Sequence, residues 1–125
     1  MATAKTQLKV HTSEELKDII AHYVTALQKH IRVSQVILFG SYAHGNPRRE
    51  SDIDLAVMSP DFNKNPLEEL YLLSQARAAV SWDIEALPYS LQQYAHCEPG
   101  SFLHEIIRTG VVMYDGERTD RSAQE

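Results

Sequence analysis

The sequence predicts a small α/β domain with a mixed β-sheet flanked by helices. Three observations support this prediction. Residues 14–31 and 66–80 carry apolar side chains at spacings of three and four, residues 33–39 end in an apolar run of four before Gly40, and residues 51–58 alternate in polarity. The first pattern is typical of amphipathic helices, and the other two are typical of strands. With 125 residues, 43% apolar and 23% charged, the chain fits a single globular domain spanning residues 1–125.

The first half of the chain predicts a helix and two strands. Thr12 or Ser13 is the expected N-cap, because acids follow it in the first helical turn, where the helix dipole favours negative charge. The apolar stripe of this helix extends to Ile31, and His22 and His30 lie off it, facing solvent. A buried strand over 33–39, a helical turn and a second strand from Ser51 to Met58 follow.

The second half predicts a helix, a strand, a helix and a short edge strand. The next helix begins at Pro66 and ends near Val80, and its apolar stripe is expected to enter the core; this stripe comprises Leu67, Leu70, Tyr71, Leu73 and Ala76. A strand over 82–87 comes next. Ser101 is the expected N-cap of a last helix that Gly110 closes, and residues 111–114 form the edge strand. Residues 1–11 and 115–125 are expected to be tails.

Composition narrows the class of protein. The net charge of −5 argues against long-range attraction to nucleic acid. Cys97 is the only cysteine, which excludes an intramolecular disulfide. The first residues lack the apolar core of a signal peptide, and no apolar run is long enough to span a membrane. We therefore expect a cytoplasmic protein with no membrane partner.

Acidic side chains on the two later strands suggest a metal site. Asp52 and Asp54 are two residues apart, so they share one face of their strand, and Asp83 and Glu85 have the same relationship. Carboxylate oxygens favour Mg²⁺ or Mn²⁺. The Gly40-Ser41 turn offers backbone N–H groups and a hydroxyl to a phosphate. Together these features predict metal-assisted phosphoryl or nucleotidyl transfer.

At these residues the sequence resembles a known family. Gly40-Ser41, followed eleven residues after Ser41 by Asp52-Ile53-Asp54, is similar to the signature of the nucleotidyltransferase superfamily that includes DNA polymerase beta. The longer strings LFGSYAHG and SDIDLAV resemble the minimal nucleotidyltransferase (MNT) domains of prokaryotes, and the similarity continues to FLHEIIRTGVVMY.

The resemblance implies a role for each matching residue. Gly40 and Ser41 would hold the triphosphate of ATP or another nucleoside triphosphate. Asp52 and Asp54 would bind two Mg²⁺ ions, and a third carboxylate would bind the second ion and help to deprotonate the acceptor hydroxyl. Glu85 is the expected third acid, in the string Ile84-Glu85-Ala86-Leu87, and Asp83 is the alternative.

The chain departs from the family pattern at His44, where many members have arginine. Arg48 and Arg49, in the following loop, are the candidates to replace that arginine at the nucleotide. The resemblance also implies a partner, since MNT proteins neutralise HEPN ribonuclease toxins by adenylylating a tyrosine. The alternative function is a nucleotide-binding antitoxin or regulator of low catalytic strength that acts by partner binding. Modification of a small molecule is a third reading.

Overall fold

A four-stranded mixed sheet forms the centre of the protein. The computed structural model describes residues 10–116. The strand order is β3-β2-β1-β4, with β1 at Gln35–Phe39, β2 at Ile53–Met58, β3 at Ile84–Tyr89 and β4 at Val111–Asp115. Strand β1 pairs antiparallel with both β2 and β4, whereas β2 and β3 are parallel. The predicted mixed sheet is confirmed.

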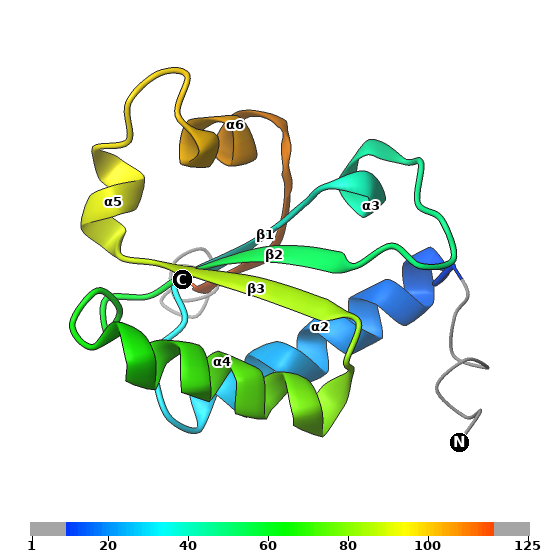
Figure 1. Ribbon diagram of the computed structural model, residues 1–125, viewed down its shortest axis with the longest axis horizontal. Coiled ribbons are helices and arrows are strands. Elements are labelled where there is room, and N and C mark those ends of the chain that lie inside the picture. Colours follow the sequence, from blue (N-terminus) through cyan, green and yellow to red (C-terminus); the bar gives the residue numbers. More distant parts are fainter. Residues whose placement is uncertain (1–9, 117–125) are drawn as a thin grey trace, which may run out of the picture.

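Helices cover both faces of this sheet (Figure 1). Helices α2 (Ser13–Gln28) and α4 (Pro66–Val80) lie below it, and α5 (Leu91–Ala95) and α6 (Phe102–Thr109) lie above it. The short helix α3 (Ser41–His44) stands at the end of β1. Within residues 10–116, none of these helices combines the length and the apolar character needed to cross a membrane.

Local capping explains where α2 begins. The Thr12 side chain accepts a hydrogen bond from the Glu15 backbone N–H at 3.1 Å, and the Glu15 carboxylate accepts one from the Thr12 N–H at 2.9 Å. This reciprocal pair satisfies two N–H groups that the first helical turn leaves unpaired. Thr12 rather than Ser13 is therefore the N-cap, and both expected solvent-facing histidines of this segment are exposed.

The sheet has an apolar cluster on each face. The lower cluster joins α2 and α4 to one side of the strands and includes Tyr23, Leu27, Leu55 and Ile84. The upper cluster is smaller and joins α5 and α6 to the other side; it includes Ile37, Ala56, Met58, Leu103 and Ile106. Strand β2 is consequently buried on both faces except at Asp54, which is half-buried at the strand start.

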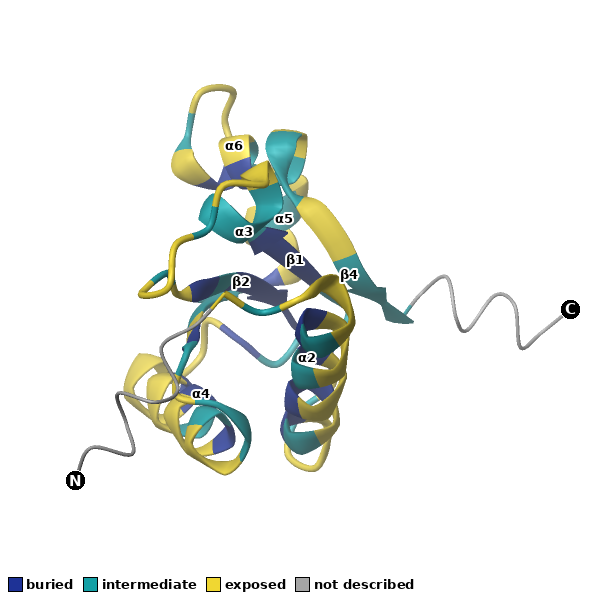
Figure 2. Ribbon diagram, turned by 90° about the vertical axis from the view of Figure 1, so that its right-hand side faces the viewer, coloured by how far each residue is buried: buried dark blue, intermediate teal, exposed yellow. Residues whose placement is uncertain are grey.

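The prediction for the apolar face of α4 was wrong in part. Leu73 and Ala76 are buried, but Leu67, Leu70 and Tyr71 are exposed, with Leu67 at 80%. The buried stripe runs through Glu69, four residues before Leu73, and the Glu69 carboxylate accepts hydrogen bonds from the backbone N–H groups that precede the helix. Glu69 takes the core position at the helix start, and the three larger side chains lie on the exposed side of α4. Figure 2 shows exposed residues along one side of this helix.

Strand β3 lies two residues later than predicted. A turn at Ser81–Asp83 precedes it, in which the Asp83 N–H donates to the Ser81 hydroxyl at 3.2 Å. The strand continues through Pro88, which an edge strand tolerates because one side needs no ladder hydrogen bond. Helix α5 was not predicted. Its signal is the capping box that Ser90 and Gln93 form.

Candidate active site

The Gly-Ser turn and the aspartate pair meet at one end of the sheet. Strands β1 and β2 are antiparallel and place Phe39 opposite Asp54, so the residue after Phe39 approaches the Asp54 side chain. A Cβ built on Gly40 would overlap Asp54 Oδ2 and would stand 3.1 Å from its Cγ. Any larger residue at position 40 would have to displace the Asp54 carboxylate, so glycine lets the turn pass this close to it.

The same turn begins α3. Gly40 has φ +78° and ψ −158° and is the N-cap of the helix. Its carbonyl accepts hydrogen bonds from the N–H groups of Ala43 and His44, both at 3.1 Å. The first N–H groups of any helix have no partner inside it. The N–H groups of Ser41 and Tyr42 are the first two of α3, and the Ser41 residue is half-buried.

Asp54 and Glu85 occupy neighbouring positions on the upper face of the sheet. The parallel register pairs Asp54 with Glu85 directly. Ile53, Leu55, Ile84 and Ala86 pack into the cluster below the sheet, and successive side chains alternate, so both acids have the parity of the upper face; at the sheet edge the Glu85 carboxylate also reaches Arg77 of α4. Asp52 has the parity of Asp54 and is exposed just before the strand.

The pKa of Asp54 reflects its burial and its proximity to the other two acids. Burial raises the pKa of the Asp54 carboxyl above its usual value, and the negative charges of Asp52 and Glu85 raise it further. Each neighbouring carboxylate makes the ionised form of Asp54 less favourable. A cation bound between them would relieve this repulsion.

Glu85 is also in contact with the α4 side of the sheet edge. Its carboxylate lies 3.9 Å from Arg77 Nη1 and is 55% exposed. Arg77 donates two hydrogen bonds to the Trp82 carbonyl, at 3.2 and 3.0 Å, and its guanidinium lies 5.2 Å from the centroid of the Trp82 ring. The arginine is thereby held beside Glu85.

Asp83 has a different neighbour. Its Oδ2 lies 2.7 Å from Nε2 of His11, a largely buried side chain. The His11 backbone N–H donates to the Tyr42 hydroxyl at 3.0 Å, so this histidine links α2, α3 and the turn before β3. His11 fell within an expected tail, and no local pattern connects it with an acid 72 residues away. Of the two candidate third acids, only Glu85 pairs in register with Asp54.

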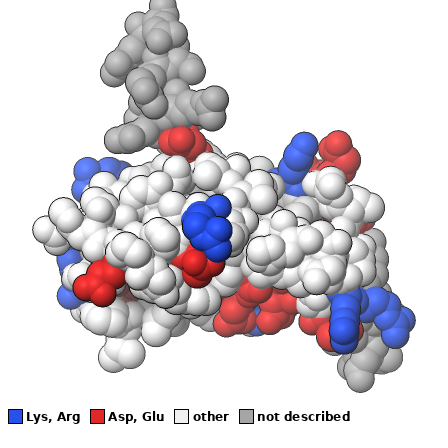
Figure 3. All heavy atoms as spheres, turned by 90° about the horizontal axis from the view of Figure 1, so that it is seen from above, with Lys and Arg blue, Asp and Glu red and all other residues white. Residues whose placement is uncertain are grey.

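The three basic candidates lie at the rim. His44 is the exposed last residue of α3, and Arg48 and Arg49 are exposed in the loop that leads to β2. The loop is ordered by the Arg48 N–H, which donates to the Ser51 hydroxyl at 2.7 Å. Seen from above, most of the surface over α5 and α6 is uncharged, and acidic side chains gather along one margin of it (Figure 3).

The oxygen ligands suit a hard divalent cation. Asp52, Asp54 and Glu85 supply carboxylates only, which are the ligands that Mg²⁺ and Mn²⁺ prefer. Between residues 10 and 116, no three acid, histidine or cysteine side chains already converge as a metal cluster. The chemistry of the residues and the repulsion at Asp54 nevertheless fit a site that a metal–nucleotide complex completes, because Mg²⁺ commonly takes few protein ligands together with substrate phosphates.

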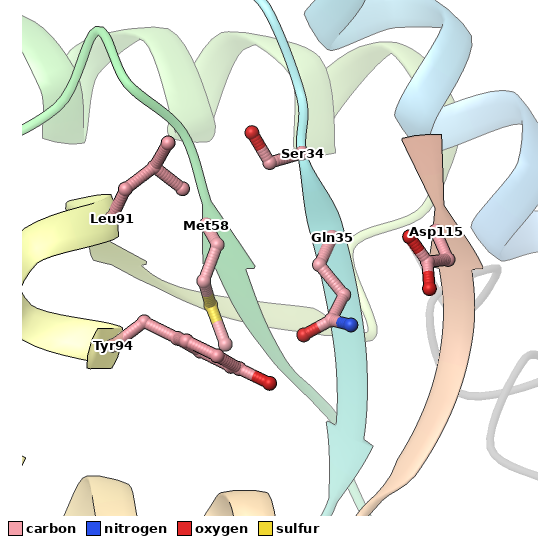
Figure 4. A pocket seen from close by; sticks show the side chains of 6 residues that line it. All are labelled: Ser34, Gln35, Met58, Leu91, Tyr94 and Asp115. Carbon is pink, nitrogen blue, oxygen red and sulfur yellow. The ribbon is translucent and has the colours of Figure 1, made fainter. Parts of the chain in front are cut away.

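A separate cavity of about 260 Å³ lies at the opposite end of the upper face. Its floor is formed by Gln35 and Met58, and α5 contributes Leu91 and Tyr94 to one wall (Figure 4). Gln35 begins β1 and Met58 ends β2, whereas Asp54 lies at the other end of this strand pair. The cavity is therefore not part of the acidic site.

Comparisons with known proteins agree with this arrangement. The family described as "Polymerase beta, Nucleotidyltransferase" matches residues 13–119. A candidate protein adenylyltransferase of Methanocaldococcus jannaschii is 34% identical over 59 residues, which are 45% of this chain and 69% of that protein. A second one from the same organism is 39% identical over 54 residues, which are 43% of this chain and 51% of its own length.

Solved structures share the fold. A candidate nucleotidyltransferase of Sulfolobus solfataricus has a TM-score of 0.62 at 16% identity and covers 88% of this chain and 93% of its own. A toxin–antitoxin complex with AMP-PNP has a TM-score of 0.55 at 23% identity, with coverages of 84% and 77%. A tri-AMPylated Shewanella oneidensis HEPN toxin in complex with its MNT antitoxin has a TM-score of 0.52 at 18% identity, with coverages of 88% and 78%.

Proposed function

Because the chain belongs to the polymerase beta nucleotidyltransferase family, we propose that it transfers AMP from ATP to a hydroxyl group with divalent metal ions at Asp52 and Asp54. The observation that supports this most directly is the close packing of Gly40 against Asp54. It brings a phosphate-binding turn and a metal-binding carboxylate into contact. A metal-bound triphosphate needs both at once.

The proposed reaction is an in-line displacement at the α-phosphorus of ATP. The acceptor oxygen forms a bond to this phosphorus, the bond from the phosphorus to the bridging oxygen breaks, and pyrophosphate leaves. Glu85, beside Asp54 in the sheet, takes the proton of the acceptor hydroxyl. Gly40 and Ser41 hold the triphosphate. Divalent ions held by Asp52 and Asp54 would neutralise its charge and lower the pKa of the acceptor hydroxyl. His44, Arg48 and Arg49 are proposed rim contacts to the nucleotide.

We further propose that the acceptor is a tyrosine of a helical partner protein of the HEPN type. The support from this molecule is an apolar surface beside Glu85, which we call the α4 patch: Leu67, Leu70, Tyr71 and Trp82, each at least half exposed. Leu70 and Glu85 line the same small cavity. Exposed apolar groups along one element favour a protein interface, and Leu70 places this one next to the carboxylate that the acceptor must reach.

The second candidate function is a nucleotide-binding antitoxin or regulator that acts by partner binding, with little catalysis. Its support is His44, an exposed residue at a position where many family members have arginine. An arginine would offer a permanent charge to phosphate, which a histidine does not.

Labelled ATP separates the two functions. The protein is incubated with Mg²⁺ and [α-³²P]ATP, alone and with the product of the neighbouring gene, beside an Asp52→Asn/Asp54→Asn double variant. We expect metal-dependent label on the partner, absent with the double variant. Tight partner binding that the double variant retains, with no label in either case, would support the antitoxin instead.

A further inference from the structure

The sheet places acids and aromatics on opposite sides of Asp54. At the level of Asp54 on the upper face, β3 contributes Glu85 and β1 contributes Phe39, which are the register partners of Asp54 on its two sides. Phe39 packs against the upper cluster, so its ring shares the face of the two acids. Gly40 directly follows Phe39, and the phosphate-binding turn therefore begins on the aromatic side.

A second aromatic ring extends this side toward solvent. Phe102 is the first residue of α6, and its ring centroid lies 5.7 Å from that of Phe39 at an interplanar angle of 88°. This edge-to-face contact is a favoured geometry for two aromatic rings. The Ser101 hydroxyl accepts a hydrogen bond from the His104 N–H at 3.1 Å, which fixes the start of the helix that carries Phe102.

Phe102 nevertheless remains 60% exposed. The two apolar residues around it on α6, Leu103 and Ile106, are buried against the sheet, so the core of this helix is complete without the Phe102 ring. A large apolar side chain that is anchored on one edge and open on the other has room for another flat ring.

We propose that Phe102 is the surface on which the base of the bound nucleotide stacks. This inference rests on the proposed function, since it takes the phosphates to lie at Gly40 and Ser41. The order of the strands places the two substrates on different sides of Asp54. The acceptor hydroxyl meets Glu85 on the β3 side of Asp54, and the nucleotide, held by the turn that follows Phe39, extends to the β1 side.

Stacking also defines the kind of ligand. An aromatic side chain binds the π-face of any base, and such contacts tolerate different bases because they do not read hydrogen-bonding groups. Phe102 therefore contributes affinity for nucleoside triphosphates over inorganic polyphosphate, with weak preference among bases. Removal of one stacking ring is expected to weaken nucleotide binding by about tenfold.

Calorimetric binding tests this role without any chemical step. A non-hydrolysable ATP analogue and tripolyphosphate, each with Mg²⁺, are titrated into the wild-type protein and into Phe102→Ala, Phe102→Trp and Leu91→Ala. Leu91 is also an exposed apolar residue above the sheet, but it lines the separate cavity at the other end of the upper face, so Leu91→Ala is the control. We expect Phe102→Ala to weaken the analogue about tenfold and leave tripolyphosphate unchanged, and Phe102→Trp to retain analogue binding.

Three results would overturn the proposal: unchanged analogue binding in Phe102→Ala, equal weakening of the analogue and tripolyphosphate, or no analogue binding by the wild-type protein. Weaker binding of the gene neighbour's product with unchanged analogue binding would assign Phe102 to a protein interface instead. The transfer assay distinguishes this proposal from the proposed function. Phe102-dependent analogue binding without label transfer would reject the enzyme and keep the base site. Label transfer with an unaltered KM for ATP in Phe102→Ala would keep the enzyme and reject the base site.

Discussion

The carboxylate of Asp54 lies against the α-carbon of Gly40, with Asp54 Cγ 3.1 Å from the position that a β-carbon on residue 40 would take. The contact joins the end of β1 to the start of β2 at the point where the proposed triphosphate and metal meet. It explains why a glycine is needed before Ser41 for a reason beyond backbone conformation.

Gly40→Ala is expected to abolish label transfer, because the new methyl group must displace the Asp54 carboxylate. Gly45→Ala is the control. Gly45 has almost the same φ, +79° against +78°, but its Cβ would meet nothing within 4 Å. The left-handed backbone makes Gly45→Ala cost about 1–2 kcal/mol in the free energy of unfolding. Gly40→Ala costs about 1–3 kcal/mol from its backbone, because ψ −158° puts Gly40 in a region that is essentially limited to glycine. Transfer that survives in Gly40→Ala, or fails equally in Gly45→Ala, would contradict the role of the contact.

Asp54→Asn is expected to raise the free energy of unfolding at pH 7 in EDTA. Burial, then the charges of Asp52 and Glu85, raise the pKa of Asp54 in the folded state above 3.8, so the ionised carboxylate opposes folding at neutral pH. That penalty is relieved as the pH falls through the raised pKa toward 3.8. The advantage of the variant should therefore shrink on acidification, as urea unfolding at pH 7 and pH 4 can show.

Mg²⁺ is expected to make the wild-type protein more stable than Asp54→Asn. Metal that binds only the folded protein adds about 2.7 kcal/mol to the free energy of unfolding at a concentration one hundred times Kd, and chelation removes this gain. The wild-type protein should gain stability from Mg²⁺ and Asp54→Asn should gain little. An equal gain in both proteins would place the ion elsewhere.

Glu85→Gln is expected to reduce kcat by at least about a hundredfold, because it removes the proposed general base. Asp83→Asn should leave kcat near the wild-type value but lower the melting temperature, since Asp83 contacts the largely buried His11 at 2.7 Å. Single-turnover rates and thermal unfolding of both variants provide the test. If Asp83→Asn has the larger effect on kcat, Asp83 is the third acid.

The α4 patch is expected to bind the protein partner. Leu70→Ser/Tyr71→Ser should weaken complex formation with the gene neighbour's product and leave binding of the ATP analogue unchanged. Leu91→Ser is the control, because Leu91 is also exposed but belongs to α5 above the sheet. Co-purification and calorimetry measure the effect. Equal affinity in the patch variant and the wild-type protein would remove the patch from the interface.

Local patterns predicted most of the fold. The apolar stripe of α2 and the alternation in β2 depend on neighbours a few residues away. Both elements are present, although α2 ends at Gln28 instead of Ile31 and β2 begins at Ile53 instead of Ser51. The buried face of α4 was predicted wrongly in part, because the sequence of this helix contains two apolar stripes. Which of them entered the core was decided by the capping role of Glu69, which the apolar pattern does not show.

The site could be predicted to the same extent. The spacing of Gly40, Asp52 and Asp54 indicated a common site, and in the structure Gly40 packs against the Asp54 carboxylate while the Asp52 charge acts on it; the roles of these residues stay predictions. The relation of Glu85 to Asp54 depends on a parallel register, and the contact of Asp83 with His11 joins distant segments. Phe102 was counted only as a helix residue, because its exposure and its contact with Phe39 arise from the placement of α6 over β1.

The position of the radioactive phosphorus tests the central claim most directly. The protein and its neighbouring gene's product are incubated with Mg²⁺ and with either [α-³²P]ATP or [γ-³²P]ATP. Nucleotidyl transfer predicts label on the partner only from the α-position, and the γ-label released as pyrophosphate. Label on the partner from the γ-position would show phosphoryl transfer and contradict the account.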